Sequence, residues 1–350
     1  MKNLIAFLLC FMLTYACKQS TTTETKAPTT TPKKITTKKQ YPTVGSIERL
    51  DSELDNIIPK SAVIEVLGSG MVWAEGPLWI PEKQWVLCSD VKENRIHKWS
   101  ASEGFTTFLE PSGFTGKETD SREKGSNGLT LDAAGNLVMC HHGDRRVAKL
   151  VSSWDKPAPK FETIADKFDG KKFNSPNDLI YDSKGNLYFT DPPFGLSEAM
   201  MDDPKKELPF QGIYKYTKDG QLTLLTKEMS RPNGLALSPD EKTLYVSNAD
   251  MTQAIWMSFP VLADGTLGKG KLFHDATLLA GKEVGVPDGV KVDRHGNIFT
   301  AGPGGLWIFN PAGKILGKIR PGEWVSNCNF DDTGKTLYIT ADDYLMRVKL

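Results

Sequence analysis

The stretch FNSPNDLIYDSKGNLYFTDPPFG, residues 173–195, contains the unit from which the fold can be predicted. Its second half is a turn at Gly185-Asn186 followed by a run of strand-forming residues, LYFTD. Its first half places an amide and a carboxylate, Asn177 and Asp178, at the start of another short strand, LIYD. This order of polar residue, strand, turn and second strand returns throughout the chain.

Six short strands begin in this way. Their polar first residues stand in EGPLWI at Glu75, NGLTLD at Asn127, NDLIYD at Asn177, NGLALS at Asn233, DGVKVD at Asp288 and NCNFDD at Asn327. Each unit continues with a second and a third strand-like run, and the first five add a fourth. A repeat of about 50 residues with four short strands is typical of a β-propeller blade. The sequence therefore predicts an all-β fold, a six-bladed β-propeller spanning residues 61–350.

The last unit lacks a fourth strand of its own, because the sequence ends at Leu350 after the third strand-like run. The segment AVIEVL, residues 62–67, precedes the first unit and has the pattern of a strand. We expect this N-terminal strand to complete the last blade, since pairing there closes the ring and leaves no open sheet edge.

The N-terminus is predicted to direct export. Residues 1–17 contain an apolar run that is too short to span a membrane but suits a signal peptide. Ala16-Cys17 resembles a bacterial lipobox, so we expect a periplasmic or cell-envelope lipoprotein whose only membrane contact is a lipid on Cys17; an ordinarily cleaved secreted form is the alternative. Residues 18–60, rich in Thr, Lys and Pro at their start, are expected to form a flexible linker and lead-in.

Charge and cysteine content exclude two classes of protein. The chain has 43 basic and 43 acidic residues, a formal net charge of zero, so nucleic-acid binding is not expected. Its five cysteines show no paired spacing, which argues against a disulfide framework, and those at 88, 140 and 328 are expected to be small buried residues. Nothing in the sequence sets an oligomeric state.

The six polar first residues indicate chemistry, because the first strand of a propeller blade is the innermost. Their side-chain oxygens are expected to form a ring around the axis. Turn formation by Asn-Gly or Asp-Gly is the simpler explanation, but it does not account for Glu75 or for Asn177-Asp178. Carboxylate and amide oxygens without His or Cys suit a hard cation. We therefore expect one divalent cation, calcium first, with magnesium or zinc as alternatives.

The loops at the same face of the ring are expected to bind the substrate. They carry Asp191, Arg145 and His142, and they include an insertion at residues 197–210. A loop of this length is more often a lid or binding loop than an accident. His142 is a candidate proton carrier, since histidine exchanges protons near neutral pH, and a solvated loop histidine is the alternative.

Four stretches then resemble a known family: GSNGLTLDAAGNLVMCHHGDRRV, KKFNSPNDLIYDSKGNLYFTDPPFGL, RPNGLALSPDEKTLYVSN and VPDGVKVDRHGNIFTAG. They are similar to the gluconolactonase branch of the senescence-marker-protein / gluconolactonase / luciferin-regenerating-enzyme superfamily, and the resemblance runs through all six blades. Members are six-bladed propellers with one divalent cation, often calcium, and many hydrolyse sugar lactones or related esters. The resemblance implies a lactonase, with a small sugar lactone as its partner.

Site residues carried over by motif are the implied metal ligands Glu75, Asn177, Asn233 and Asp288. Some relatives use the residue equivalent to Asn177 as a substrate contact, and some carry a substrate-binding Arg two residues before it. This chain has Ser175 there, so its recognition of the sugar must differ. The stretch HHGDRR resembles a branch motif whose fixed histidine falls on His142.

The implied mechanism is metal-assisted lactone hydrolysis, in which the cation polarises the carbonyl and Asp288 takes a proton from the attacking water. His142 would donate a proton to the leaving ring oxygen or hold a sugar hydroxyl. The expected substrate contacts are Asn127, Asn177, His142, Asp191 and Arg145. A non-catalytic ligand-binding propeller with a structural cation is one alternative. A broader metal-dependent esterase is another, which a more apolar mouth would favour.

Overall fold

The computed structural model describes Ala16 and residues 40–350. The rest of the predicted signal segment, the predicted lipidation of Cys17 and the first part of the predicted linker, up to residue 39, lie outside the described residues. The chain divides into Met1–Gln40 and Tyr41–Leu350, and every strand and helix described below belongs to the second unit. No helix in the described part of the chain is long and apolar enough to cross a membrane.

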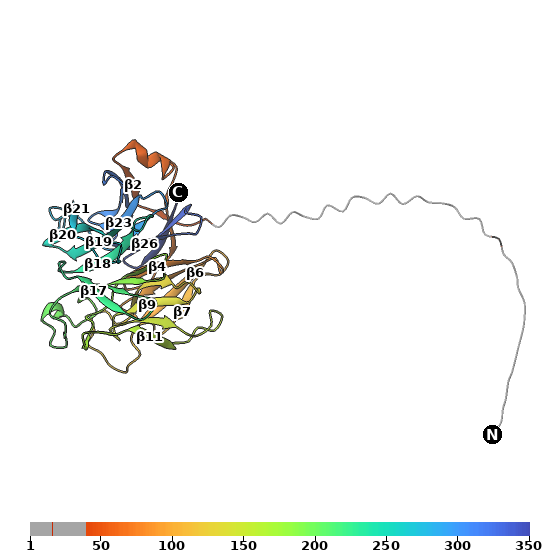
Figure 1. Cartoon of the computed structure of the whole chain (residues 1–350). Coiled ribbons are helices and arrows are strands. Elements are labelled where there is room, and N and C mark those ends of the chain that lie inside the picture. Colours follow the sequence, from red (N-terminus) through yellow and green to blue (C-terminus); the bar gives the residue numbers. More distant parts are fainter. Residues whose placement is uncertain (1–15, 17–39) are drawn as a thin grey trace, which may run out of the picture. The chain divides into compact units, whose positions relative to one another are not determined.

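Six antiparallel sheets form the blades of a propeller (Figure 1). The first blade consists of β4 (Ala74–Ile80), β5 (Trp85–Asp90), β6 (Arg95–Ser100) and β7 (Gly104–Leu109). The second consists of β8 (Ser126–Leu131), β9 (Leu137–His141), β10 (Arg146–Leu150) and β11 (Phe161–Ala165). The third consists of β14 (Leu179–Tyr181), β15 (Leu187–Asp191), β16 (Gly212–Tyr216) and β17 (Leu222–Thr226). The fourth blade consists of β18 (Pro232–Leu237), β19 (Thr243–Asp250), β20 (Gln253–Pro260) and β21 (Lys271–Asp275). The fifth consists of β22 (Val290–Val292), β23 (Ile298–Gly302), β24 (Gly305–Phe309) and β25 (Ile315–Arg320).

The sixth blade contains β26 (Val325–Phe330), β27 (Thr336–Ala341) and β28 (Tyr344–Lys349). A short ribbon of β12 (Lys167–Phe168) and β13 (Lys171–Lys172) lies between the second and third blades in sequence. The first strand of each blade contacts the first strands of its neighbours, so that β4, β8, β14, β18, β22 and β26 surround the axis. The six predicted blades are confirmed.

The predicted closure by an N-terminal strand is also confirmed. β3 (Ile64–Gly68) pairs antiparallel with β28, with Val66 opposite Met346 and Glu65 opposite Arg347. The Arg347 Nε and Glu65 Oε2 atoms lie 2.6 Å apart across this pairing. The strand begins at Ile64 rather than at residue 62, and β1 (Thr43–Val44) adds a further strand outside it.

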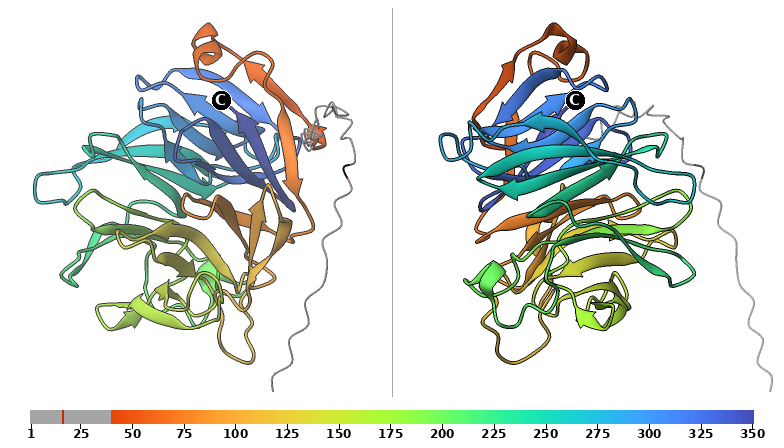
Figure 2. Two further views of the ribbon diagram at one scale, coloured as in Figure 1. Left: turned by 90° about the vertical axis from the view of Figure 1, so that its right-hand side faces the viewer. Right: turned by 60° about the vertical axis from the view of Figure 1, so that its left-hand side comes forward.

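The folded unit begins earlier than the expected boundary at residue 61. β2 (Ser46–Arg49) pairs with β25 as a fifth strand of the fifth blade, and the 3-10 helix η1 (Ser52–Asn56) follows it. Figure 2 shows this orange segment beside the blue C-terminal blades. Leu54 and Ile58 are completely buried between the fifth and sixth blades. Residues 41–60 therefore belong to the propeller, because they bury apolar surface that a flexible linker would leave exposed.

The hydrophobic core consists of six clusters, one between each pair of consecutive blades. Leu87 of the first blade, for example, packs with Met139 of the second. The middle strands β5 and β9 are buried on both faces because each lies between two neighbouring blades. The free cysteines are buried as expected, at positions 88, 140 and 328. This packing sets the distance between the first strands and so brings their leading residues together.

Candidate active site

Glycines allow the first strands to approach closely. A Cβ atom at Gly234 would lie 2.5 Å from the carbonyl oxygen of Asp288, and one at Gly128 would lie 2.7 Å from that of Asn177. Neither glycine has a positive φ, so the Asn-Gly pairs at these positions are needed for contact between blades rather than for a tight turn. This close packing places the polar first residues of neighbouring blades side by side.

Hydroxyl groups hold these residues from the preceding blade. In three cases a Ser or Thr on the second strand of one blade donates a hydrogen bond to the main-chain carbonyl of the next blade's polar first residue. The pairs are Ser89 with Asn127 at 2.8 Å, Thr190 with Asn233 at 2.8 Å, and Ser247 with Asp288 at 2.6 Å. The backbone of the ring is thus fixed by bonds across three blade boundaries, and the side chains remain available for other partners.

Five of the six predicted ring side chains line one cavity of about 300 Å³. They are Glu75, Asn127, Asn177, Asn233 and Asp288, and each is at most 5% exposed. The Oδ1 atoms of Asn127, Asn177 and Asp288 are buried without a hydrogen-bond partner in the described part of the chain. Buried oxygens without a partner are costly, so this arrangement fits a ligand that supplies positive charge or donors.

Burial raises the pKa of two carboxylates that line the cavity, Glu75 and Asp288. Removal from water is the main cause at Glu75 and at Asp288, and their proximity adds to it: the Glu75 carboxylate further raises the pKa of Asp288, and that of Asp178 raises both. A hydrogen bond donated by the Gly76 N–H to Glu75 Oε2 at 3.0 Å acts in the opposite direction. Negative charges held this close repel one another, and a cation bound between them would offset that repulsion.

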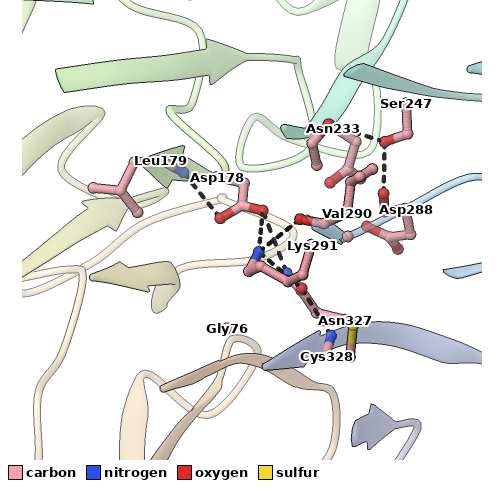
Figure 3. A network of polar contacts seen from close by, with 12 residues as sticks. Gly76, Asp178, Leu179, Asn233, Ser247, Asp288, Val290, Lys291, Asn327 and Cys328 are labelled. Atoms are coloured by element: carbon pink, nitrogen blue, oxygen red, sulfur yellow. Dashed lines mark hydrogen bonds and ion pairs between the residues drawn. The ribbon is translucent and has the colours of Figure 1, made fainter. Parts of the chain in front are cut away.

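Asn327, the sixth predicted ring residue, does not line the cavity. Its Nδ2 lies 3.4 Å from Glu75 Oε2 and 3.5 Å from Asp178 Oδ2, to which it donates. Its Oδ1 accepts a hydrogen bond from Lys291 Nζ at 3.3 Å (Figure 3). The ring is therefore divided: five side chains turn to the cavity, and Asn327 joins a second polar network beside it.

The cavity mouth carries several large apolar side chains. Trp73 and Trp324 both line it, with ring centroids 5.8 Å apart and ring planes at 72°. Phe194, Met200 and Met251 add further apolar surface from three other segments. These residues had no repeated pattern in the sequence, because they come from connecting segments that differ between blades; Met200, for example, begins the short 3-10 helix η2 (Met200–Asp202).

Two long loops form one side of the mouth together. The loop that enters the second blade contributes Arg122 and Glu123, and the region of the 197–210 insertion contributes Met200. The Arg122 N–H donates to the carbonyl of Leu196 at 2.9 Å, and Ser121 Oγ donates to that of Gly195 at 2.6 Å. The insertion itself contacts this loop through the ion pair of Lys205 Nζ with Asp120 Oδ1 at 2.6 Å. The loop carries Glu123, a cavity residue that the sequence did not single out.

Arg231 is a second cavity residue that was missed. It stands two residues before Asn233, which is the place that Ser175 occupies before Asn177 in the preceding blade. Alignment of the blades could have found it. In this chain the third blade has Ser175 where some relatives carry a substrate-binding arginine, whereas the fourth blade has Arg231 at the corresponding position.

His142 lies behind the cavity wall. It has no exposed surface, its Nε2 lies 3.4 Å from Asn177 Nδ2, and its Nδ1 lies 3.4 Å from Glu123 Oε2. These contacts place it next to two cavity residues but not on the wall itself. Direct proton transfer from His142 to a substrate does not fit this position.

Asp191 and Arg145 are not brought into the cavity. Asp191 accepts hydrogen bonds from the backbone N–H groups of Asn174 at 2.9 Å and Ser175 at 2.7 Å. Arg145 Nε donates to the carbonyl of Phe173 at 2.7 Å. Both side chains shape the segment that leads into Asn177, so the expectation that they contact substrate does not match their places.

A carboxylate with the same backbone contacts as Asp191 recurs in another blade. In the first blade Asp90, at the end of the second strand, accepts in the same way from the backbone N–H groups of Val72 and Trp73, at 3.1 Å each. A carboxylate at this point of a blade supports the entry to the first strand. Its recurrence in the sequence is therefore a structural feature of the repeat.

Comparison with known proteins agrees with the propeller fold. The family model for the SMP-30/Gluconolactonase/LRE-like region matches residues 73–343. A gluconolactonase from Zymomonas mobilis is 39% identical over 320 residues, which cover 88% of this chain and 86% of that protein. The structure of XC5397 from Xanthomonas campestris, described as a gluconolactonase, has a TM-score of 0.76 at 29% identity and covers 89% of this chain and 98% of that one.

A more distant relative has a different named activity. The diisopropyl-fluorophosphatase of Loligo vulgaris is 29% identical over 208 residues, which cover 57% of this chain and 64% of that protein. The family match spans all six blades, as the resemblance of the four sequence stretches implied. The chain belongs to the SMP-30/gluconolactonase/LRE-like family.

Proposed function

We propose that this protein hydrolyses a small sugar lactone in the cavity lined by Glu75 and Asp288, with one divalent cation bound there. The observation that carries the proposal is the convergence of three amides and the buried carboxylates of Glu75, Glu123 and Asp288 on one cavity, where three oxygens have no partner in the described part of the chain. The gluconolactonases that match most of the chain support the reaction class. The cavity volume of about 300 Å³ is in the range of small-molecule sites.

The side chains of the cavity fit a hard cation. The residues that would hold it are Glu75, Asn177, Asn233 and Asp288, all of which offer oxygen. No group of three or more His, Cys, Asp or Glu side chains in residues 40–350 is arranged to hold a metal ion, so amide oxygens are essential to this site. Calcium accepts such mixed carboxylate and amide ligands, magnesium is the alternative, and zinc, which prefers His and Cys, fits least.

When bound, the cation would polarise the lactone carbonyl and stabilise the negative charge that develops on its oxygen. We assign proton acceptance from the attacking water to Asp288. Its Oδ1 is buried and has no hydrogen-bond partner in the described part of the chain, so this oxygen is available to accept a proton. Glu75 already accepts a hydrogen bond from the Gly76 N–H and is assigned mainly to cation binding.

The remaining cavity residues would orient the substrate. Asn127 and Arg231 offer donors to sugar hydroxyls, and Trp73 offers an apolar face to the ring. Glu123 lines the cavity, so we assign to it the proton donation to the leaving ring oxygen that the sequence suggested for His142. His142, 3.4 Å from Glu123 and from Asn177, is a positioning residue for both.

A metal-dependent esterase of broader specificity is the second candidate. The apolar mouth formed by residues such as Phe194, Met200 and Met251 favours it, because aryl and alkyl groups bind to such surfaces. The named activity of the diisopropyl-fluorophosphatase relative supports the same direction.

A substrate panel separates these functions. Glucono-δ-lactone, other aldonolactones, phenyl acetate and diisopropyl fluorophosphate are tested with protein freed of metal and again after calcium is restored. The proposal predicts calcium-dependent turnover that is fastest with an aldonolactone. Faster turnover of phenyl acetate or the fluorophosphate would favour the esterase. Substrate binding without turnover of any compound would favour the ligand-binding propeller.

A further inference from the structure

A lysine ammonium lies at the meeting point of three blades beside the cavity. Lys291 Nζ is 3.3 Å from Asp178 Oδ2, 3.3 Å from Asn327 Oδ1 and 3.0 Å from the carbonyl oxygen of Val290 (Figure 3). Asp178 belongs to the third blade, Lys291 to the fifth and Asn327 to the sixth. Three oxygens thus surround the ammonium, as oxygens surround a bound cation.

The partners of this ammonium are buried and otherwise fixed. Asp178 is 2% exposed and Asn327 is 1% exposed. The second carboxylate oxygen of Asp178 accepts a hydrogen bond from the Leu179 N–H at 2.9 Å, and Asn327 Oδ1 accepts one from the Cys328 N–H at 2.9 Å. Lys291 forms the ion pair of Asp178 within the described residues. A carboxylate with so little access to water depends on such a partner.

The network continues into the cavity. Because Asn327 directs its oxygen to Lys291, its Nδ2 faces Glu75 Oε2 at 3.4 Å and Asp178 Oδ2 at 3.5 Å. Glu75 Oε2 and Asp178 Oδ2 therefore face the same donor, so the Asp178 charge lies beside a carboxylate of the cavity. Lys291 is therefore coupled to the cavity by charge, through Asp178, and by a hydrogen-bonded path, through Asn327.

We propose that Lys291 is a tethered cation that compensates Asp178 and thereby limits how strongly the cavity carboxylates attract a free divalent cation. It is a positioning and charge-balancing residue, and the inference rests on the proposed metal site. Without the ammonium, the Asp178 charge would add to those of Glu75 and Asp288. The cavity would then bind calcium more tightly, and the protein without calcium would be less stable.

The test uses the full chain with Lys291→Met, which keeps an unbranched side chain only one atom shorter and removes its charge. A second variant, Lys291→Met with Asp178→Asn, removes both members of the ion pair. Lys318→Met is the matched control: Lys318 is 6% exposed and lies in the same blade, where it contacts Glu283 at 3.9 Å and the Trp307 ring at 3.8 Å. Calcium affinity is measured by isothermal titration, and the Tm by thermal unfolding of metal-freed protein.

The expected result for Lys291→Met is a lower Tm without metal and calcium binding about tenfold tighter, from the loss of one positive charge near the site. The double variant should return both values toward those of the parent. Lys318→Met should leave calcium affinity unchanged. Unchanged or weaker calcium binding in Lys291→Met, or no recovery in the double variant, would overturn the inference. A parent protein that binds no divalent cation would instead overturn the proposed function.

Discussion

Replacing Gly234 by alanine should damage both the fold and the proposed site. The added Cβ would lie 2.5 Å from three backbone atoms of the next blade, the Asp288 oxygen, the Gly289 Cα and the Val290 nitrogen. Because carbon contacts are comfortable only at about 3.5 Å, the strands β18 and β22 must separate by roughly 1 Å. Such overpacking costs about 1–3 kcal/mol of unfolding free energy, and a 1 Å displacement of Asn233 relative to Asp288 can lower turnover about 100-fold.

Thermal unfolding and lactone turnover, measured on the same preparations, provide the assay. Each kcal/mol should lower the Tm by about 2–4 °C for a domain of this size. Gly268→Ala is the matched control, since its Cβ would meet only side-chain atoms of Pro260 and Leu262, at 3.4–3.6 Å. That variant should behave like the parent. A Gly234→Ala protein with the parental Tm and turnover would refute the reasoning that close strand contact builds the site.

Other substitutions separate the roles of further residues. Asp288→Asn keeps an oxygen ligand but loses the proposed base, so calcium titration should show retained binding while turnover falls about 10²–10⁴-fold; parental turnover would contradict the assignment. Glu75→Gln should lose activity that excess calcium partly restores, and a loss that calcium does not relieve would argue against a ligand role. Leu54→Ala should cost about 2–5 kcal/mol in chemical unfolding, because Leu54 is completely buried, whereas a neutral effect would mean that residues 41–60 do not stabilise the propeller. Cys17→Ser should release the protein from membranes on cell fractionation, and unchanged membrane association would count against lipidation.

The propeller could be predicted because its evidence is local and repeated. Each blade carries its own turn and strand pattern, so six copies identify the architecture even where one copy is weak. The closing strand followed from the missing fourth strand of the last unit. The place of residues 41–60 could not be predicted in the same way. The apolar residues of this segment, such as Leu54 and Ile58, have no counterpart in the repeat, and they are buried only because they fill a gap between the fifth and sixth blades.

The site could be predicted in part for the same reason. The leading residues of the inner strands repeat, and five of the six meet at the cavity. Contacts between blades have no such pattern. The turn of Asn327 toward Lys291, the approach of Glu123 from a long loop and the position of His142 behind Asn177 each depend on side chains far apart in sequence. The Asp191 carboxylate was assigned to substrate because its support of the backbone is visible only once the strand entry is folded.

The most direct measurement is aldonolactone turnover by the parent protein as calcium is removed and restored. The cavity side chains provide oxygen ligands, and three of these oxygens have no other partner in the described part of the chain. Turnover should therefore fall to the rate of the uncatalysed reaction once metal is removed by dialysis against a chelator. It should return on titration with calcium, with one ion bound per chain. Full turnover by a protein shown to be free of metal would contradict cation-dependent catalysis at this cavity.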